Sequence, residues 1–507
     1  MNFQRFFVKK SVADIQKEAG TGALKRSLGP WNLISLGIGC IIGTGIFVLS
    51  GHAAALHAGP AVVLSFVVAG IACAFAALCY AELASVLPIS GSAYTYAYTT
   101  LGETVAWVMG WLLLLEYGVA SATVAVGWSG YVVSFLHNLG INIPLELANP
   151  YGAPFTAQDG SEGIGLFNLP AFLGVLGVST LLITGVQESA RVNNVIVFIK
   201  LAVIITFIIV GAGHIDVENW KPFIPMNTGT FGEFGISGVL SGASMIFFAY
   251  IGFEAVSTAA QEAKNPQRDM PFGIIGALVI CTLLYILVSG VLTGIVPYSA
   301  LNVPDPIAVG VDAIGMPWLS IMVKIGAIMG LSSVMLVLIY GQTRIFFSMS
   351  RDGLLPKLFS KVHPKFKTPH IGTALLGVII ALIAGLVPLK QLGNLVNMGT
   401  LVAFCIICFT VLYLRRTEPK LARPFRCPGV PVVPVLGILS CLGLIAGLPR
   451  ETYIYLGIWF VIGVLVYAFY GFNHSKMGRN LRKAPKSVSE AVKLPKKPPQ
   501  KKAKKKS

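Results

Sequence analysis

The sequence has few charged residues, and this scarcity is its most informative absence. Charged side chains make up 12% of the 507 residues, whereas apolar ones make up 55%. Several apolar runs exceed 18 residues, about the length that an α-helix needs to cross the hydrocarbon of a bilayer. A water-soluble fold is therefore excluded, and we expect an all-α polytopic membrane protein.

Three further absences narrow the function. None of the eight cysteines falls in an expected external loop, since seven lie in expected spans and Cys427 lies in a basic loop. A disulfide framework is therefore not expected. No His, Asp and Glu cluster has the spacing of a metal or acid–base site, which argues against an enzyme, a metal site and a cofactor. The polar, basic N-terminus shows no cleavable signal peptide.

Hydropathy predicts twelve membrane-spanning helices. Their expected ranges are 32–57, 60–87, 104–136, 169–186, 192–213, 235–260, 272–296, 318–348, 371–388, 394–414, 432–448 and 452–472. The longest external loop, 137–168, is acidic and resembles a lid without chemistry of its own. No connecting segment is large enough to fold alone, so any binding site must lie among the helices.

Lys and Arg lie mostly on one side of this topology. With the N-terminus inside, the internal segments hold 33 of the 38 Lys and Arg residues, whereas the external loops hold Lys221, Lys390 and Arg450. The positive-inside rule then predicts a plasma-membrane protein with both termini in the cytoplasm. Residues 473–507 carry a net charge of +12, which attraction to anionic membrane lipids explains without nucleic acid. From about Ser475 onward we expect a disordered tail that is dispensable for activity.

A glycine-rich stretch interrupts the first helix at mid-membrane. Between Gly37 and Gly45 four of nine residues are glycine, and each is disfavoured in a helix by about 1 kcal/mol relative to alanine. The glycines could simply allow close helix packing. Alternatively, the helix unwinds at Gly43, Thr44 and Gly45 and offers bare backbone groups to a ligand.

A second interruption, around Gly252, favours unwinding. It lies within residues 247–254 of the sixth helix, five helices after the first break. Paired breaks of this kind indicate a transporter built from inverted repeats, with its site at the membrane midplane. We therefore expect a cytoplasmic segment 1–31, repeats at 32–213 and 235–414, two further helices at 432–472, and the tail at 473–507.

Ionisable residues inside the spans are the other candidates for function. Glu116 lies deep in the third helix, Glu254 follows the second break, and Lys200 lies a third of the way along the fifth helix. Such residues are costly in a bilayer and are functional by default. Structural alternatives remain, because Lys200 could extend to the interface and Glu116 could be a packed carboxyl. For Lys324 the extended, interfacial position is the favoured reading.

Several motifs resemble the amino acid–polyamine–organocation (APC) transporter family over nearly all of residues 30–472. They are Gly43-Thr44-Gly45-Ile46-Phe47, Tyr80-Ala81-Glu82-Leu83, Gly91-Ser92-Ala93-Tyr94-Thr95-Tyr96 and Gly102-Glu103. The cationic amino acid transporter branch is resembled by Phe248 to Glu254, Glu262 to Asp269, Arg344, Met349 to Gly353 and Arg423 to Gly429. The resemblance implies a LeuT-like fold of five plus five helices with two more, and transport of cationic or small neutral L-amino acids.

The two breaks suit the two ends of an amino acid. The positive start of the outer half-helix after the first break suits a carboxylate, and carbonyls at the second break suit an ammonium. The expected substrate-binding residues are Ile42, Gly43, Thr44, Gly45, Glu116, Phe248, Ala249, Ile251, Glu254, Met329 and Met335. Phe248 would cover the site, and the two methionines would form a wall, although isolated methionines are more often core residues.

The resemblance also implies proton coupling. Family members with a lysine in the fifth helix place its ammonium against the first helix, and Lys200 matches that position with Gly39 as its expected neighbour. The expected partners are thus an L-amino acid, protons and membrane lipids, while a small membrane-protein partner stays unknown. An exchanger of the same fold, a channel, or a membrane anchor with a lipid-binding tail are the alternatives.

Overall fold

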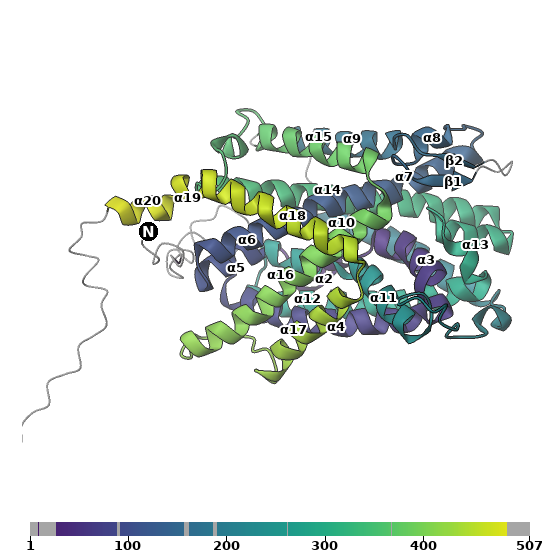
Figure 1. The fold of residues 1–507 in the computed structure, drawn as a ribbon, viewed down its shortest axis with the longest axis horizontal. Helices are drawn as coiled ribbons and strands as arrows, with labels where there is room; N and C mark the ends of the chain where they lie inside the picture. The colour runs from purple at the N-terminus through teal and green to yellow at the C-terminus, as the bar shows by residue number, and fades with distance from the viewer. Residues whose placement is uncertain are drawn as a thin grey trace, which may run out of the picture.

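A computed structural model describes residue 9 and residues 27–88, 92–156, 162–185, 190–260, 262–366 and 368–483. Most of the expected cytoplasmic segment 1–31 and the tail from 484 to 507 therefore lie outside the described residues. Long helices run side by side along one axis of the molecule (Figure 1). In the described part, strands occur only as a short antiparallel pair, β1 (Pro154–Thr156) and β2 (Glu162–Ile164).

Eight helical runs of the described chain are long and apolar enough to cross a membrane, and this confirms a helical polytopic membrane protein. They are Gly45–Val86, Glu103–Asn138, Val192–Ala212, Gly235–Ala259, Pro266–Ile295, Pro317–Arg351, Leu389–Thr417 and Arg450–His474. Four shorter apolar helices accompany them: α2 (Pro30–Ile41), α9 (Leu169–Ile183), α15 (His370–Leu386) and α17 (Val432–Ala446).

Within these runs the elements alternate between α-helix and tighter or wider turns. The α-helices are α3 (Ser50–Ala53), α4 (Val62–Val86), α6 (Glu103–Leu113), α7 (Ala120–Asn138), α10 (Ala190–Ala212), α11 (Gly235–Ile246), α12 (Pro266–Ile295), α14 (Pro317–Arg351), α16 (Leu389–Thr417), α18 (Arg450–Val466) and α19 (Phe472–His474). Wider π-turns are η2 (Gly45–Leu49), η3 (Ala54–Ala58), η5 (Leu114–Val119) and η11 (Tyr467–Gly471), and tighter 3₁₀-turns are η4 (Gly59–Ala61), η7 (Phe247–Tyr250) and η8 (Glu254–Ala259).

Short elements lie at the two ends of the bundle (Figure 1). At one end lie α8 (Leu145–Ala148), the two strands and α13 (Pro306–Ile314), and at the other lie α5 (Ser92–Thr100) and α20 (Lys476–Lys483). The remaining turns are η6 (Val217–Trp220), η9 (Tyr298–Leu301) and η10 (Lys357–Ser360). Hydropathy did not predict α5, because this helix is short and mixes polar with aromatic residues.

Both expected interruptions are present in the helices. The first helix stops at Ile41, Ile42 is extended with φ −73° and ψ 98°, and helical structure resumes by Gly45. The break therefore begins one residue before Gly43, the first of the three residues at which we expected the helix to unwind. In the second interruption Ile251 is extended, and Gly252 adopts φ +119°, a conformation that L-residues rarely adopt.

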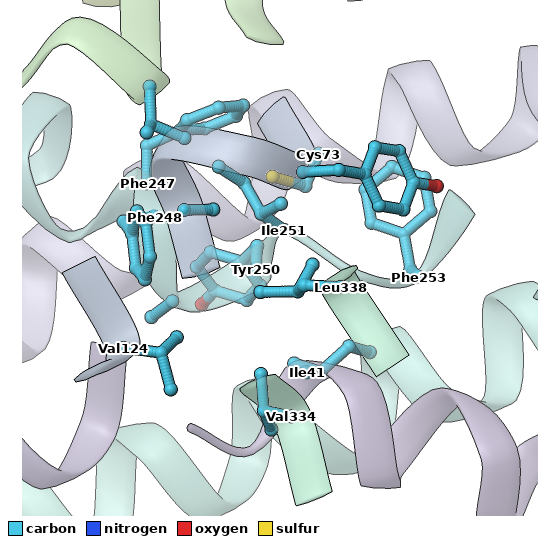
Figure 2. Close-up of a cluster of buried hydrophobic side chains, with 14 of the residues drawn as sticks. Ile41, Cys73, Val124, Phe247, Phe248, Tyr250, Ile251, Phe253, Val334 and Leu338 are labelled. Atoms are coloured by element: carbon cyan, nitrogen blue, oxygen red, sulfur yellow. The ribbon is translucent and has the colours of Figure 1, made fainter. Parts of the chain in front are cut away.

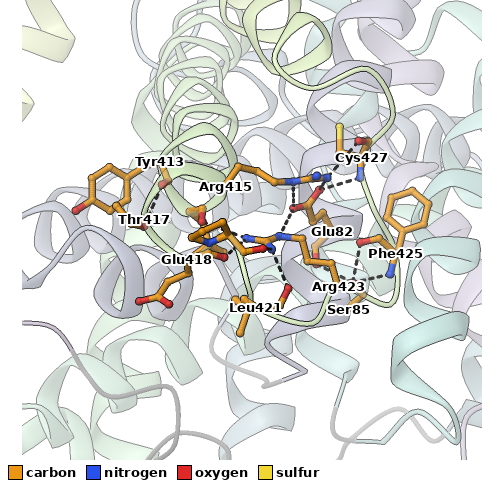
Figure 3. A network of polar contacts seen from close by, with 12 residues as sticks. Glu82, Ser85, Tyr413, Arg415, Thr417, Glu418, Leu421, Arg423, Phe425 and Cys427 are labelled. Atoms are coloured by element: carbon orange, nitrogen blue, oxygen red, sulfur yellow. Dashed lines mark hydrogen bonds and ion pairs between the residues drawn. The ribbon is translucent and has the colours of Figure 1, made fainter.

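A buried carboxylate joins α4 to the segment after α16 (Figure 3). Glu82 is fully buried and accepts hydrogen bonds from Arg415 Nε at 2.9 Å and from Arg415 Nη2 at 2.7 Å. Arg423 Nε lies 3.2 Å from the same carboxylate, and the backbone N–H of Cys427 donates to it at 2.8 Å. Because each charge has a partner, this ion cluster holds the end of α4 against residues 415–427.

The chain beyond α18 is anchored to the bundle. Ser475 is fully buried, and its hydroxyl donates to the carboxylate of Glu103. Tyr98 donates to that carboxylate at 2.8 Å, Tyr467 donates at 3.2 Å, and the backbone N–H of Lys476 donates to Asp352 O at 3.0 Å. The expectation that the tail starts at Ser475 was therefore wrong, because residues 475–478 belong to the packed structure.

Candidate functional site

The two interrupted helices cross at their breaks. A Cβ atom added to Gly45 would lie 2.1 Å from Ala249 Cα, so the two backbones touch here. The hydroxyl of Tyr285, on α12, lies 2.9 Å from both the Ile41 and the Ala249 carbonyl oxygens. Tyr285 therefore contacts one freed carbonyl of each break, and its single proton can serve one of them at a time.

A small enclosed cavity of about 10 Å³ lies against this crossing. It is lined by Cys40, Ile41, Gly43, Thr44, Gly45, Ala120, Val124, Phe248, Ile251, Val334 and Leu338. Figure 2 shows Phe248, Ile251, Val124, Val334 and Leu338 gathered there from separate elements. Such a volume holds about one water molecule, so an amino acid fits only if these elements move apart.

The lining is apolar with one exception. Thr44 is fully buried, and within the described chain its hydroxyl has no hydrogen-bond partner. The first N–H groups of a helix also lack partners within that helix, and the half-helix that resumes at Gly45 begins beside this hydroxyl. The break thus offers polar groups at one side of the cavity, whereas α7 and α14 offer aliphatic side chains at the other.

Lys200 reaches the first break from α10. Its side chain is fully buried, and Nζ lies 2.8 Å from the Gly39 carbonyl oxygen and 3.1 Å from the Ile42 carbonyl oxygen. Both carbonyls belong to the end of α2, where no following helical turn is available to accept from. The ammonium therefore bonds directly to the backbone of the break, and it does not extend to the membrane surface.

Glu116 and Glu254 lie outside the cavity lining. Both carboxyls are buried and adjoin one another, one from η5 and one from η8. Glu254 also accepts a hydrogen bond from the N–H of Gly252 at 2.9 Å, so it caps the second break. The carboxyl pair is therefore close enough to the breaks to shape them, although it does not line this cavity.

The other expected residues fall into two groups. Gly43, Thr44, Gly45, Phe248 and Ile251 line the cavity, whereas Ile42, Ala249, Met329 and Met335 do not. Ile42 is fully buried and its carbonyl accepts from Lys200, and Ala249 packs against Gly45. Met335 is buried elsewhere in the core, and Met329 is 38% exposed.

The expected methionine wall does not line the cavity in this conformation, and its role in binding stays a prediction. Its place is taken by Val334 and Leu338, which are four residues apart on α14, and by Ala120 and Val124, which are four apart on α7. Side chains at this spacing share a helix face, so one residue of each pair, once identified, predicts the other. No sequence signal distinguished this face from the adjacent one that carries Met335.

A second cavity of about 180 Å³ adjoins the first, and both are lined by Cys40. Its polar lining comes from Asn32, Asn193, Asn194, Thr258, Glu262, Tyr340 and Arg344. Asn193 lies beside Gly39, because a Cβ there would stand 2.9 Å from its side-chain oxygen. The wall between the two cavities is therefore the segment of α2 that Lys200 holds.

The crossed breaks and the buried site indicate a transporter. No group of three His, Cys, Asp or Glu side chains within the described residues could hold a metal ion. The amino acid permease family model matches residues 28–473. The chain is thus an amino acid permease of the APC superfamily related to the cationic amino acid transporters, and it is a transporter rather than an enzyme.

Curated relatives of known name extend over nearly the whole chain. A branched-chain amino acid permease, BcaP, from Bacillus subtilis is 49% identical and covers 93% of this chain and 99% of its own length. A methylthioribose transporter from the same organism is 48% identical, with the same shares covered. A vacuolar cationic amino acid transporter 4 from Arabidopsis thaliana is 39% identical over 80% of this chain and 65% of its own length.

Proposed function

We propose that this protein imports L-amino acids with small apolar side chains across the plasma membrane, by alternating access and in symport with protons. The observation that carries the proposal is the crossing of two helix breaks beside a cavity whose other walls are aliphatic. Freed N–H groups at Gly43 to Gly45 would receive the carboxylate, and carbonyls at Phe248, Ala249 and Ile251 would receive the ammonium.

The sequence left cationic and small neutral amino acids open as substrates, and the aliphatic lining favours the neutral ones. None of the described residues that line the central cavity carries a charge, so the side chain of a cationic amino acid would have no counter-ion among them. Ala120, Val124, Val334 and Leu338 instead favour burial of a branched aliphatic side chain. The printed name of a relative, branched-chain amino acid permease, agrees with this substrate class.

The topology completes the proposal. We place both termini in the cytoplasm, because 33 of 38 Lys and Arg residues then lie inside. We assign twelve membrane crossings to the eight long apolar runs and the four shorter helices. In this assignment the run Gly45–Val86 turns at Gly59, and α2 forms the first half of the first crossing. Two repeats of five, 32–213 and 235–414, would rock against one another around the crossed breaks.

Proton coupling would act through Lys200. When charged, its ammonium bonds to the carbonyls of Gly39 and Ile42 and holds α2 against α10. Without the proton these bonds weaken and α2 can move. The central cavity then joins the adjoining cavity of about 180 Å³.

Counterflow in proteoliposomes tests the substrate class. Purified protein would be reconstituted with an internal pool of each of the twenty L-amino acids in turn, and exchange for labelled leucine would be measured. We expect leucine, isoleucine and valine to support exchange and arginine and lysine to fail. Methylthioribose belongs in the same panel, because a 48% identical relative carries that name. Exchange by arginine alone would refute the proposed substrate class.

A further inference from the structure

A larger cavity lies apart from the central site, at the end of the bundle that carries α8 and α13. Its volume is about 450 Å³, within the usual range for small-molecule sites. The walls come from α7, from residues 141–150 with α8, and from Pro304 and Asp305 ahead of α13. Its polar lining consists of Ser129, Ser134, His137, Asn142, Asn149, Asn168 and Asp305.

Asp305 is the carboxylate of this lining. Ser134 of α7 is its polar neighbour, and Lys324 of α14 and Asp312 of α13 are its charged neighbours. Lys324 is 2% exposed, and its ammonium lies 3.6 Å from Asp312, whose side chain is 53% exposed. Two carboxylates share one ammonium here, which leaves a net charge of −1 beside the cavity.

Two further polar residues line the same space. Ser129 and Asn168 are each 1% exposed, and the side-chain oxygen of Asn168 caps α9 by accepting from the N–H of Ala171 at 3.0 Å. The hydroxyl of Ser129 and the side-chain nitrogen of Asn168 are both hydrogen-bond donors, so this wall of the cavity carries donors for a ligand.

The outer cavity and the central cavity lie along the same helix, α7, although they share no lining residue. Val126 of α7 lines the outer cavity, and Val124 on the same helix lines the central cavity. Tyr131 of α7 donates to the Phe47 carbonyl oxygen at 2.7 Å, beside the first break. A molecule in the outer cavity would therefore sit less than two turns of α7 from the proposed substrate site.

We propose that this cavity is an outer subsite that binds the ammonium group of an incoming amino acid through Asp305. The inference rests on the proposed function for its orientation and for the identity of the ligand. Ser129 and Asn168 offer donors for the carboxylate, and Val126, Val133 and Ile141 offer apolar surface for the side chain. A half-buried carboxylate with a net negative surrounding selects a cationic group and disfavours an anion.

The first test measures binding without transport. Isobutylammonium, which carries the ammonium and side chain of leucine without the carboxylate, is the probe for the purified full-length protein. Saturation-transfer NMR should detect it on the wild type and on Asp312→Asn. Asp305→Asn should weaken its binding by about tenfold, the loss of one charge-assisted contact. Asp312 is the matched control, since it also faces Lys324 but does not line the cavity.

The second test uses the direction of transport. Asp305→Asn should raise the KM for leucine entering from the outer face by about tenfold, while the KM for exit from the inner face stays unchanged. Val133→Trp, which fills the cavity and keeps the Asp305 carboxylate, should have the same one-sided effect. A merely structural role for Asp305 would change both directions together and would leave isobutylammonium bound.

The outcomes separate the two proposals. If the wild type binds isobutylammonium through Asp305 but exchanges no amino acid, the proposed function fails and the outer subsite stands. If Asp305→Asn binds the probe as the wild type does, or changes entry and exit equally, the outer subsite is overturned whatever the protein transports.

Discussion

Lys200 Nζ lies 2.8 Å from the carbonyl oxygen of Gly39, across the interface between α10 and the end of α2. The two residues are 161 positions apart in the sequence. In a continuous helix the Gly39 carbonyl oxygen would accept a hydrogen bond from the N–H four residues later. The charge and the break are thus complementary, because the lysine supplies the donor that the interrupted helix lacks.

Removal of this ammonium should uncouple transport from the proton gradient. In Lys200→Met proteoliposomes, a proton gradient should drive no accumulation of leucine. For the wild type, uptake should rise as external pH falls, and replacement of sodium by potassium should change nothing, because a fixed cation opposes sodium binding. Lys221→Met is the control, since Lys221 is exposed and pairs with Glu218. A sodium requirement at constant pH, or full proton-driven accumulation by Lys200→Met, would refute the mechanism.

The two glycines of the first break should respond differently to substitution. A Cβ at Gly45 would overlap Ala249 Cα, whereas a Cβ at Gly43 would meet Val334 Cγ2 at 3.3 Å. Gly45→Ala should therefore destabilise the fold by about 1–3 kcal/mol. Gly43→Leu should fill the cavity and abolish substrate binding in a folded protein. Thermal melting with and without leucine separates these effects, and a ligand-induced shift in Gly43→Leu would contradict a role for this break in binding.

The buried carboxyl pair should control the pH dependence of transport. Within the described part of the chain, Glu116 and Glu254 adjoin one another and neither contacts a basic side chain, and two buried like charges are disfavoured. Glu116→Gln and Glu254→Gln should each change the pH profile of uptake, with the larger effect at Glu254 because it caps Gly252. Leucine counterflow between pH 5 and pH 8 provides the measurement. Profiles identical to that of the wild type in both variants would make the pair structural.

Removal of the residues that follow α20 should be tolerated, whereas removal of α20 itself should not. A chain ending at Lys483 should keep its uptake rate, since the remaining residues add charge that salt screens. A chain ending at Asn473 removes Ser475 and the Lys476 N–H, which bind Glu103 and Asp352. We expect it to lose stability, and Ser475→Ala in the full chain should lose about 1 kcal/mol. Equal melting temperatures for all these chains would show that the anchor contributes nothing.

Probe binding in the outer cavity should depend on external pH. Burial raises the pKa of Asp305 to about 6, with Ser134 and Lys324 opposing that rise and Asp312 adding to it. Above pH 6 the carboxylate is charged and holds the ammonium, so isobutylammonium binding should be strong at pH 7.5 and weak at pH 5. Asp305→Asn should bind the probe weakly at both pH values, and a pH dependence equal to that of the wild type in this variant would assign the titration to another group.

Hydropathy and glycine placement determined the broad architecture from the sequence alone. Apolar runs set which segments are membrane helices, since a bilayer tolerates little else, and the glycines marked both breaks to within a residue or two. The sequence also identified Glu254 and Lys200 as candidate functional residues, because an ionisable side chain inside an apolar run has few acceptable roles. These signals are local, so a short segment of the sequence contains each of them.

The tertiary structure decided which side chains meet. Val334 rather than Met335 faces the central cavity because the rotation of α14 depends on its packing against α7 and the breaks, which hydropathy does not encode. Ser475 is buried because Glu103, 372 positions away, accepts its hydroxyl, so a segment that reads as a polar tail folds into place. The outer cavity around Asp305 likewise exists only where three distant segments come together, and no local pattern marks it.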